Sequence, residues 1–162
     1  MDYRPFPKLT KEFVAQQIKV DWDDLAWALS HHWLNVKVIS ELADGIAAKD
    51  EELRTSFAMA GMDGDEIAMR ASIDHQVQKF VVSDDLVRER WMLIALAWLY
   101  QHRDIFDNPW AAVEELWEAF DHPSSINCLI SWMPVPPGGE AGEEAMLKRW
   151  QTLADSLSRP PD

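Results

Sequence analysis

The feature that most constrains this chain is an uninterrupted apolar stretch in its second half. Residues 91–100 read WMLIALAWLY and are apolar on every side of a helix. A globular protein accommodates such a helix only where other elements surround it. The stretch is about half as long as a bilayer span requires, so no membrane-spanning segment is expected. We therefore predict a central helix at residues 84–103, which begins after Ser83 with two acidic residues at its positive end.

The rest of the chain carries apolar residues at helical spacing, with almost no alternating strand pattern. Capping residues separate these segments, among them Thr10, Asn35, Asn108 and an Asp21/Asp24 pair at capping-box spacing. The pattern predicts an all-α fold, a compact multi-helix bundle of about eight helices around the central one. The surrounding helices are expected at residues 11–19, 21–32, 36–49, 51–60, 63–82, 109–121, 123–131 and 142–158.

The length of the chain and the position of its proline- and glycine-rich segment predict one domain. The chain has 162 residues, and about 150 residues is the usual size of a domain. Residues 133–141 are rich in proline and glycine and cannot continue a helix, because proline lacks a backbone donor. We expect residues 1–162 to form a single helical domain, in which this loop precedes a C-terminal helix that docks back on the bundle.

Composition limits the partners and the compartment. Acidic residues number 28 against 15 basic ones, so the formal net charge is −13 and phosphate backbones would be repelled. A single cysteine, Cys128, permits no intrachain disulfide and no thiolate-rich metal site. No basic flank precedes an apolar signal segment at the N-terminus. We expect a cytoplasmic protein that binds neither nucleic acid nor membranes.

No established catalytic or cofactor motif is found in the sequence. It lacks a glycine-rich phosphate loop between strand and helix, a Gly-x-Ser-x-Gly elbow, a His-Glu-x-x-His pair and a calcium loop. Cys128 lies among apolar residues, which favours an inert thiol over a nucleophile. We predict no catalytic residue, no metal ligand and no cofactor. Four scattered side chains could assemble a site only if a loop folded them together: His102, Asp104, Asp107 and His122.

The net negative charge is greatest in the last third of the chain. Residues 109–162 hold nine acidic and three basic side chains. Within them, Glu114, Glu118 and Asp121 follow i, i+4, i+7 spacing, with Glu115 beside them, opposite an apolar stripe. Like charges at this spacing cost about 0.2–0.5 kcal/mol per pair, so helix stability alone does not favour them. These four residues, the acidic ridge, are candidates for binding a basic partner; a solvated face that keeps the protein soluble is the alternative.

One tryptophan lies off the apolar stripe of its own predicted helix. Trp27 falls opposite the stripe of helix 21–32, beside Asp23 and Asp24. An aromatic residue in such a position can anchor an interface with a partner. It can equally belong to a second packed face. We include Trp27 among the candidate partner-binding residues.

Several segments resemble a known family. They are residues 90–100 (RWMLIALAWLY), Asn108-Pro109, Phe120-Asp121-His122-Pro123 and Trp132-Met133-Pro134. They are similar to a bacterial family of uncharacterised proteins, domain of unknown function 2247. The resemblance is strongest over residues 89–134 and extends to residues 21–43, whereas residues 50–82 show no match. It implies a bacterial, cytoplasmic, helical protein, and it transfers no activity, cofactor or functional residue.

Three functional hypotheses follow. The first is a non-catalytic acidic interaction domain that binds a basic protein, in the manner of an immunity or antitoxin-like inhibitor. The second is an enzyme whose site assembles from the scattered His and Asp residues named above. The third is a structural subunit that forms homo-oligomers through its aromatic surface.

Overall fold

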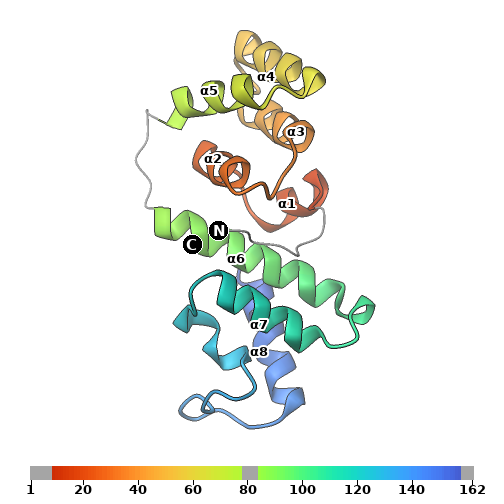
Figure 1. Ribbon diagram of the computed structural model, residues 1–162, viewed down its shortest axis with the longest axis vertical. Helices are drawn as coiled ribbons and strands as arrows, with labels where there is room; N and C mark the ends of the chain where they lie inside the picture. Colours follow the sequence, from red (N-terminus) through yellow and green to blue (C-terminus); the bar gives the residue numbers. More distant parts are fainter. Residues whose placement is uncertain (1–8, 78–83, 158–162) are drawn as a thin grey trace. The chain divides into compact units, whose positions relative to one another are not determined.

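The computed structural model describes residues 9–77 and 84–157, and the regular structure in this part is entirely helical (Figure 1). The predicted all-α fold is therefore confirmed. The α-helices are α1 (Lys11–Gln17), α2 (Trp22–Ser30), α3 (Val36–Ile46), α4 (Glu51–Asp63), α5 (Glu66–Val77), α6 (Asp84–Gln101), α7 (Pro109–Ala119) and α8 (Glu143–Asp155). Two 3-10 helices, η1 (Arg103–Ile105) and η2 (Ser124–Leu129), flank α7 in the sequence. No described helix is both long enough and apolar enough to cross a membrane.

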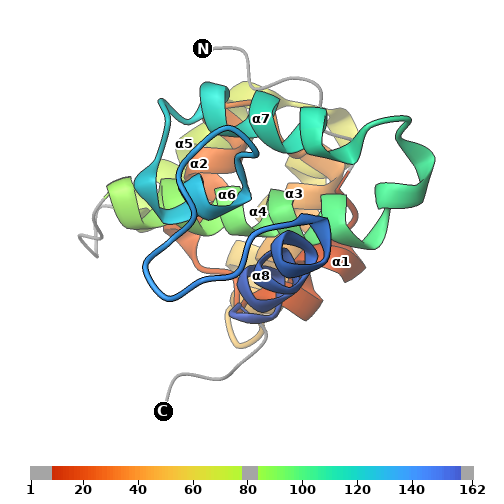
Figure 2. The ribbon, with the colours of Figure 1, turned by 90° about the horizontal axis from the view of Figure 1, so that it is seen from below.

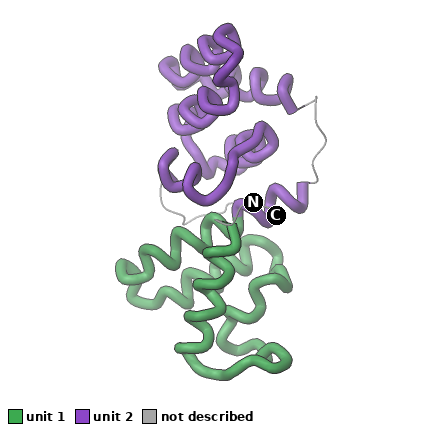
Figure 3. Tube along the Cα trace, turned by 180° about the vertical axis from the view of Figure 1, so that it is seen from behind, with its two compact units in different colours: residues 1–3, 92–162 green, residues 4–91 purple. Residues whose placement is uncertain are grey.

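The chain divides into two compact units (Figure 3). The N-terminal unit ends at Trp91, and the C-terminal unit begins at Met92. The predicted central helix is present as α6, which contributes residues to both units. Most of its residues from Trp91 onward are buried, as its all-round apolar sequence requires. The expectation of one domain stays a prediction.

The predicted caps form in the N-terminal unit. The Thr10 Oγ1 accepts a hydrogen bond from the Phe13 amide at 3.1 Å, and the Asn35 Oδ1 accepts one from the Val38 amide at 2.8 Å. Asp21 and Asp24 make the expected capping box. These bonds satisfy amides that have no partner inside the helix, so the helix starts could be read from the sequence.

The buried side chain of Asp24 also joins α2 to α6. Its residue is 0% exposed, and the Arg90 Nη1 donates to its two carboxylate oxygens at 2.9 and 2.7 Å. The Trp91 indole donates to the Asp24 backbone carbonyl at 3.1 Å. Burial raises the pKa of the Asp24 carboxyl, and the Asp21 amide and the Arg90 guanidinium oppose this only in part. The network holds the start of α6 against α2 inside the N-terminal unit.

The boundary between α4 and α5 differs from the prediction. One helix is predicted to end at residue 60 and the next to begin at residue 63, whereas α4 continues to Asp63 and α5 begins at Glu66. The residue with positive φ is Gly64, at +63°, and the cap of α5 is Asp65, which accepts from the Ala68 amide. Gly61, the first residue after the predicted helix end, lies inside α4 and packs closely on α3, because a Cβ there would lie 2.5 Å from the Cβ of Ser40.

We predict that Gly61→Ala destabilises the protein by about 1–3 kcal/mol, despite the better helix propensity of alanine. The added methyl group would displace Ser40, whose hydroxyl donates to the Phe57 carbonyl at 2.9 Å. Gly45→Ala in α3 is the matched control, because nothing lies within 4 Å of a Cβ there. Urea denaturation should show that variant to be up to about 1 kcal/mol more stable than the wild type. Equal stability of the two variants would contradict the packing role of Gly61.

Only part of the predicted helix 63–82 lies within the described residues. Met69 and Ile73, which lie four residues apart on this helix, are buried. Residues 78–83, which include the predicted cap Ser83, lie outside the described residues.

The C-terminal unit is organised around the apolar part of α6. Asn108 caps α7 as predicted, with Pro109 in the first turn. Trp150 of α8 is fully buried, and its indole donates to the Leu96 carbonyl of α6 at 3.0 Å. The C-terminal helix therefore packs against α6. The helix predicted at residues 123–131 is present only as the 3-10 helix η2, at Ser124–Leu129.

Arg149 forms hydrogen bonds to the backbone at both ends of the loop that precedes α8. Its guanidinium donates to the carbonyls of Cys128 at 3.2 Å and Glu140 at 2.9 Å. In Figure 2 the chain after η2 leads into α8, which is seen almost end-on. The proline-rich loop at residues 133–141 contains no regular helix.

Candidate functional site

The acidic ridge lies on α7 and on the turn that follows it. The buried face of α7 consists of Ala112, Val113, Leu116 and Trp117. On the other side Glu115 and Glu118 are exposed, and Glu114 is half-buried. Asp121 is exposed but lies beyond the helix, which ends at Ala119 and not at residue 121 as predicted. The helix thus places three of the four carboxylates, and the turn places the fourth.

The three glutamates of the ridge are not paired with any residue that the structure describes. Among residues 9–77 and 84–157, no side-chain hydrogen bond or ion pair engages Glu114, Glu115 or Glu118. Other carboxylates of this protein do have such partners, for example Asp44, which Arg54 contacts at 2.8 Å. These three glutamates therefore form a surface of negative charge that solvent or a partner must compensate.

A left-handed turn fixes the position of Asp121. Its φ is +58°, and the following amide, that of His122, donates to the Trp117 carbonyl at 2.8 Å. This bond, with that from the Asp121 amide to the Glu118 carbonyl at 3.1 Å, closes α7 in a Schellman-type motif. Residues with a Cβ adopt this conformation at a cost, and aspartate is among those that tolerate it best.

An aromatic cluster that sequence reasoning missed adjoins the end of the ridge. It consists of Trp117, His122 and Trp132. Trp132 is 64% exposed, and its ring lies 5.3 Å from that of Trp117, edge to face. The Trp117 indole in turn donates to the Asn127 side chain at 3.0 Å. The one sequence signal for Trp132 is its position outside every apolar stripe, just before the proline-rich loop.

Trp27 requires a correction, because its side chain is not on the surface. It is 4% exposed and stacks on Trp91 at 6.0 Å and on His31 at 4.0 Å. The second packed face, which the sequence analysis gave as the alternative, describes its surroundings. We therefore leave Trp27 out of the proposed binding surface.

The scattered histidine and aspartate residues do not converge. The His102 ring stacks on Trp98 at 3.9 Å, and its Nδ1 lies 2.9 Å from the Trp98 carbonyl oxygen. His122 packs against Trp117. In the described part of the chain, no group of three or more His, Cys, Asp and Glu residues could hold a metal ion. Burial raises the pKa of the half-buried Cys128 thiol, although Arg149 opposes this, so its reactive thiolate form is disfavoured.

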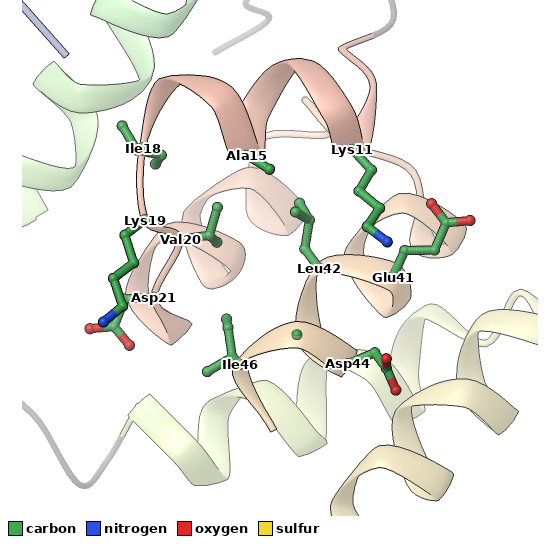
Figure 4. Close-up of a pocket in the computed structure, with 11 residues that line it drawn as sticks. Lys11, Ala15, Ile18, Lys19, Val20, Asp21, Glu41, Leu42, Asp44 and Ile46 are labelled. Carbon is green, nitrogen blue, oxygen red and sulfur yellow. The ribbon is translucent and has the colours of Figure 1, made fainter. Parts of the chain in front are cut away.

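A hollow of about 760 Å³ lies between α1, the α1–α2 connection and α3 (Figure 4). Its aliphatic lining includes Ala15, Ile18, Val20, Leu42 and Ile46. Lysine and carboxylate side chains both stand at its rim, and one of these carboxylates, Asp44, is already paired with Arg54. The mixed charge of the rim selects neither an anion nor a cation.

Comparison of the sequence with known proteins assigns the chain to a family. No curated protein and no solved structure matches it. A family model described as "Uncharacterized protein conserved in bacteria (DUF2247)" matches residues 10–154. The match includes residues 50–82, for which the sequence analysis found no resemblance. The chain therefore belongs to the bacterial family of domain of unknown function 2247.

Proposed function

We propose that the protein is a non-catalytic interaction protein of the cytoplasm that binds a basic protein partner through the acidic ridge. An immunity or antitoxin-like inhibitor is the form that we favour. The observation that carries this proposal is the exposure of Glu115 and Glu118, beside Glu114, with no cation of the described chain paired to any of the three. A basic surface would supply the missing counter-charges.

The net charge of the whole chain supports the same proposal. At −13, the protein attracts cationic macromolecules over distances of about a Debye length, close to 8–10 Å at physiological ionic strength. Such attraction accelerates association and orients the partner before contact. Nucleases and other toxins that act on nucleic acids tend to be basic, so an acidic inhibitor can associate with them rapidly.

The test is affinity capture from the host's own lysate with quantitative comparison of variants. We expect the wild type to retain a basic protein in stoichiometric amount, and Glu114→Lys/Glu118→Lys to weaken that capture by about tenfold or more. Asp74→Lys/Glu89→Lys is the matched control, because both residues are exposed on helices and the net charge changes equally. This control should bind like the wild type.

Raising the salt concentration provides an independent readout. Attraction between exposed charges is screened by salt, so capture by the wild type should fall as salt increases. If the ridge variant and the control variant lose capture equally, only overall charge matters and the ridge has no specific role. If a chain of similar negative charge retains the same proteins, the proposal fails.

A further inference from the structure

The exposed tryptophan of the C-terminal unit adds a chemical preference to the proposed surface. Every other tryptophan of the chain is buried or half-buried, whereas Trp132 is 64% exposed. Tryptophan is among the residues that contribute most to binding when an interface buries them. The position of Trp132 therefore points to a partner.

Trp132 is held in place before any partner arrives. Its ring stands edge-on to Trp117, which is itself fixed by the hydrogen bond to Asn127. The backbone on either side is closed into a turn, in which the Met133 amide donates to the Ile130 carbonyl at 3.1 Å. A side chain fixed in this way loses little conformational entropy when it is bound.

Trp132 also lies beside the acidic ridge. It contacts Trp117, and Glu114, three positions earlier, is a neighbour of Trp117 on the surface of α7. His122, which follows Asp121 in the turn after α7, also contacts the Trp117 ring. The surface thus combines an exposed indole ring with a carboxylate, that of Glu114, beside the tryptophan against which this ring packs.

We infer that Trp132 is the aromatic anchor of the partner-binding surface and that it receives an arginine side chain of the basic partner. This inference rests on the proposed function. The arginine guanidinium is planar and weakly hydrated, so it stacks on an indole ring while it donates paired hydrogen bonds to a carboxylate. The ammonium group of lysine is compact and strongly hydrated, and it matches the charge of the ridge but not the face of the ring. The surface should therefore prefer arginine over lysine at equal charge.

The test uses two fluorescent peptides of equal length and charge, one rich in arginine and one rich in lysine, with affinity measured by fluorescence anisotropy. The wild type should bind the arginine peptide about two- to fivefold more tightly than the lysine peptide. Trp132→Ala should remove this preference and still bind both peptides through the ridge. Trp132→Phe should retain part of the preference, because it keeps an aromatic face.

The controls separate this inference from the proposed function. Ile105→Ala removes another exposed apolar side chain of the same unit, one that is 70% exposed, and should leave the preference unchanged. The inference is overturned if Trp132→Ala keeps the full arginine preference while Glu114→Lys/Glu118→Lys loses both peptides, and the proposed function then stands. If Glu114→Lys/Glu118→Lys binds both peptides like the wild type, the ridge itself is not the binding surface.

Discussion

Replacing Arg90 by alanine should destabilise the N-terminal unit by about 3–5 kcal/mol at neutral pH. The Arg90 guanidinium is the cation that contacts the Asp24 carboxylate, a group 0% exposed to solvent. Removing one member of a buried pair leaves the other charge in a poorly solvated site without compensation. The neighbouring bonds from the Asp21 amide and the Trp91 indole would remain, but neither donor carries a positive charge.

The effect of Arg90→Ala should depend on pH in a defined direction. Burial already raises the pKa of the Asp24 carboxyl, and loss of Arg90, which lowers that pKa, should raise it further. Above the ordinary pKa of aspartate the folded state then binds more protons than the unfolded state, so stability falls as the pH rises through the raised pKa. The difference in free energy of unfolding between wild type and variant should be larger at about pH 8 than at about pH 5.5.

Urea denaturation at the two pH values checks this result. Arg54→Ala provides the matched control, since it removes the same side chain from an exposed ion pair with Asp44. Exposed pairs of this kind contribute little to stability, because water and salt screen them. A loss in Arg90→Ala as small as that in the control, or one that does not change with pH, would show that Asp24 is not ionised and paired in the native state.

The fold could be predicted from the sequence where local chemistry decides it. The caps Thr10, Asn35 and Asn108 each bond to an amide three residues away, so a short window of sequence contains both partners. The role of Gly61 could not be predicted in this way, because it depends on Ser40 of another helix. The same holds for Asp24, whose local capping role was predicted and whose distant partner, Arg90, was not.

The same distinction between local sequence and tertiary packing applies to the candidate surface. Helical spacing alone places Glu114 and Glu118 on one face of α7. The exposure of Trp132 and the burial of Trp27 depend on tertiary packing, and a helical wheel does not report which second face another element covers. Position outside an apolar stripe is therefore a weak indicator of exposure in a chain with nine tryptophans.

Trp150→Ala should destabilise the C-terminal unit by about 3–5 kcal/mol. The Trp150 ring is fully buried, lies 5.2 Å from that of Trp110 and 5.6 Å from that of Tyr100, and donates to the Leu96 carbonyl. Alanine would leave a cavity between α8 and α6 and remove the hydrogen bond. Trp150→Phe should cost less, because it loses the hydrogen bond but fills most of the space. The free energy of unfolding in urea measures both, with the exposed Trp132→Ala as control.

The Arg90 and Trp150 variants together test the predicted single domain. Arg90 belongs to the N-terminal unit and Trp150 to the C-terminal unit, and α6 supplies residues to both. If the chain unfolds as one cooperative domain, each variant should shift a single transition, with the same midpoint by circular dichroism and by tryptophan fluorescence. Two transitions, of which each variant shifts only one, would mean that the units fold independently. In that case α6 would not couple the unfolding of one unit to the unfolding of the other.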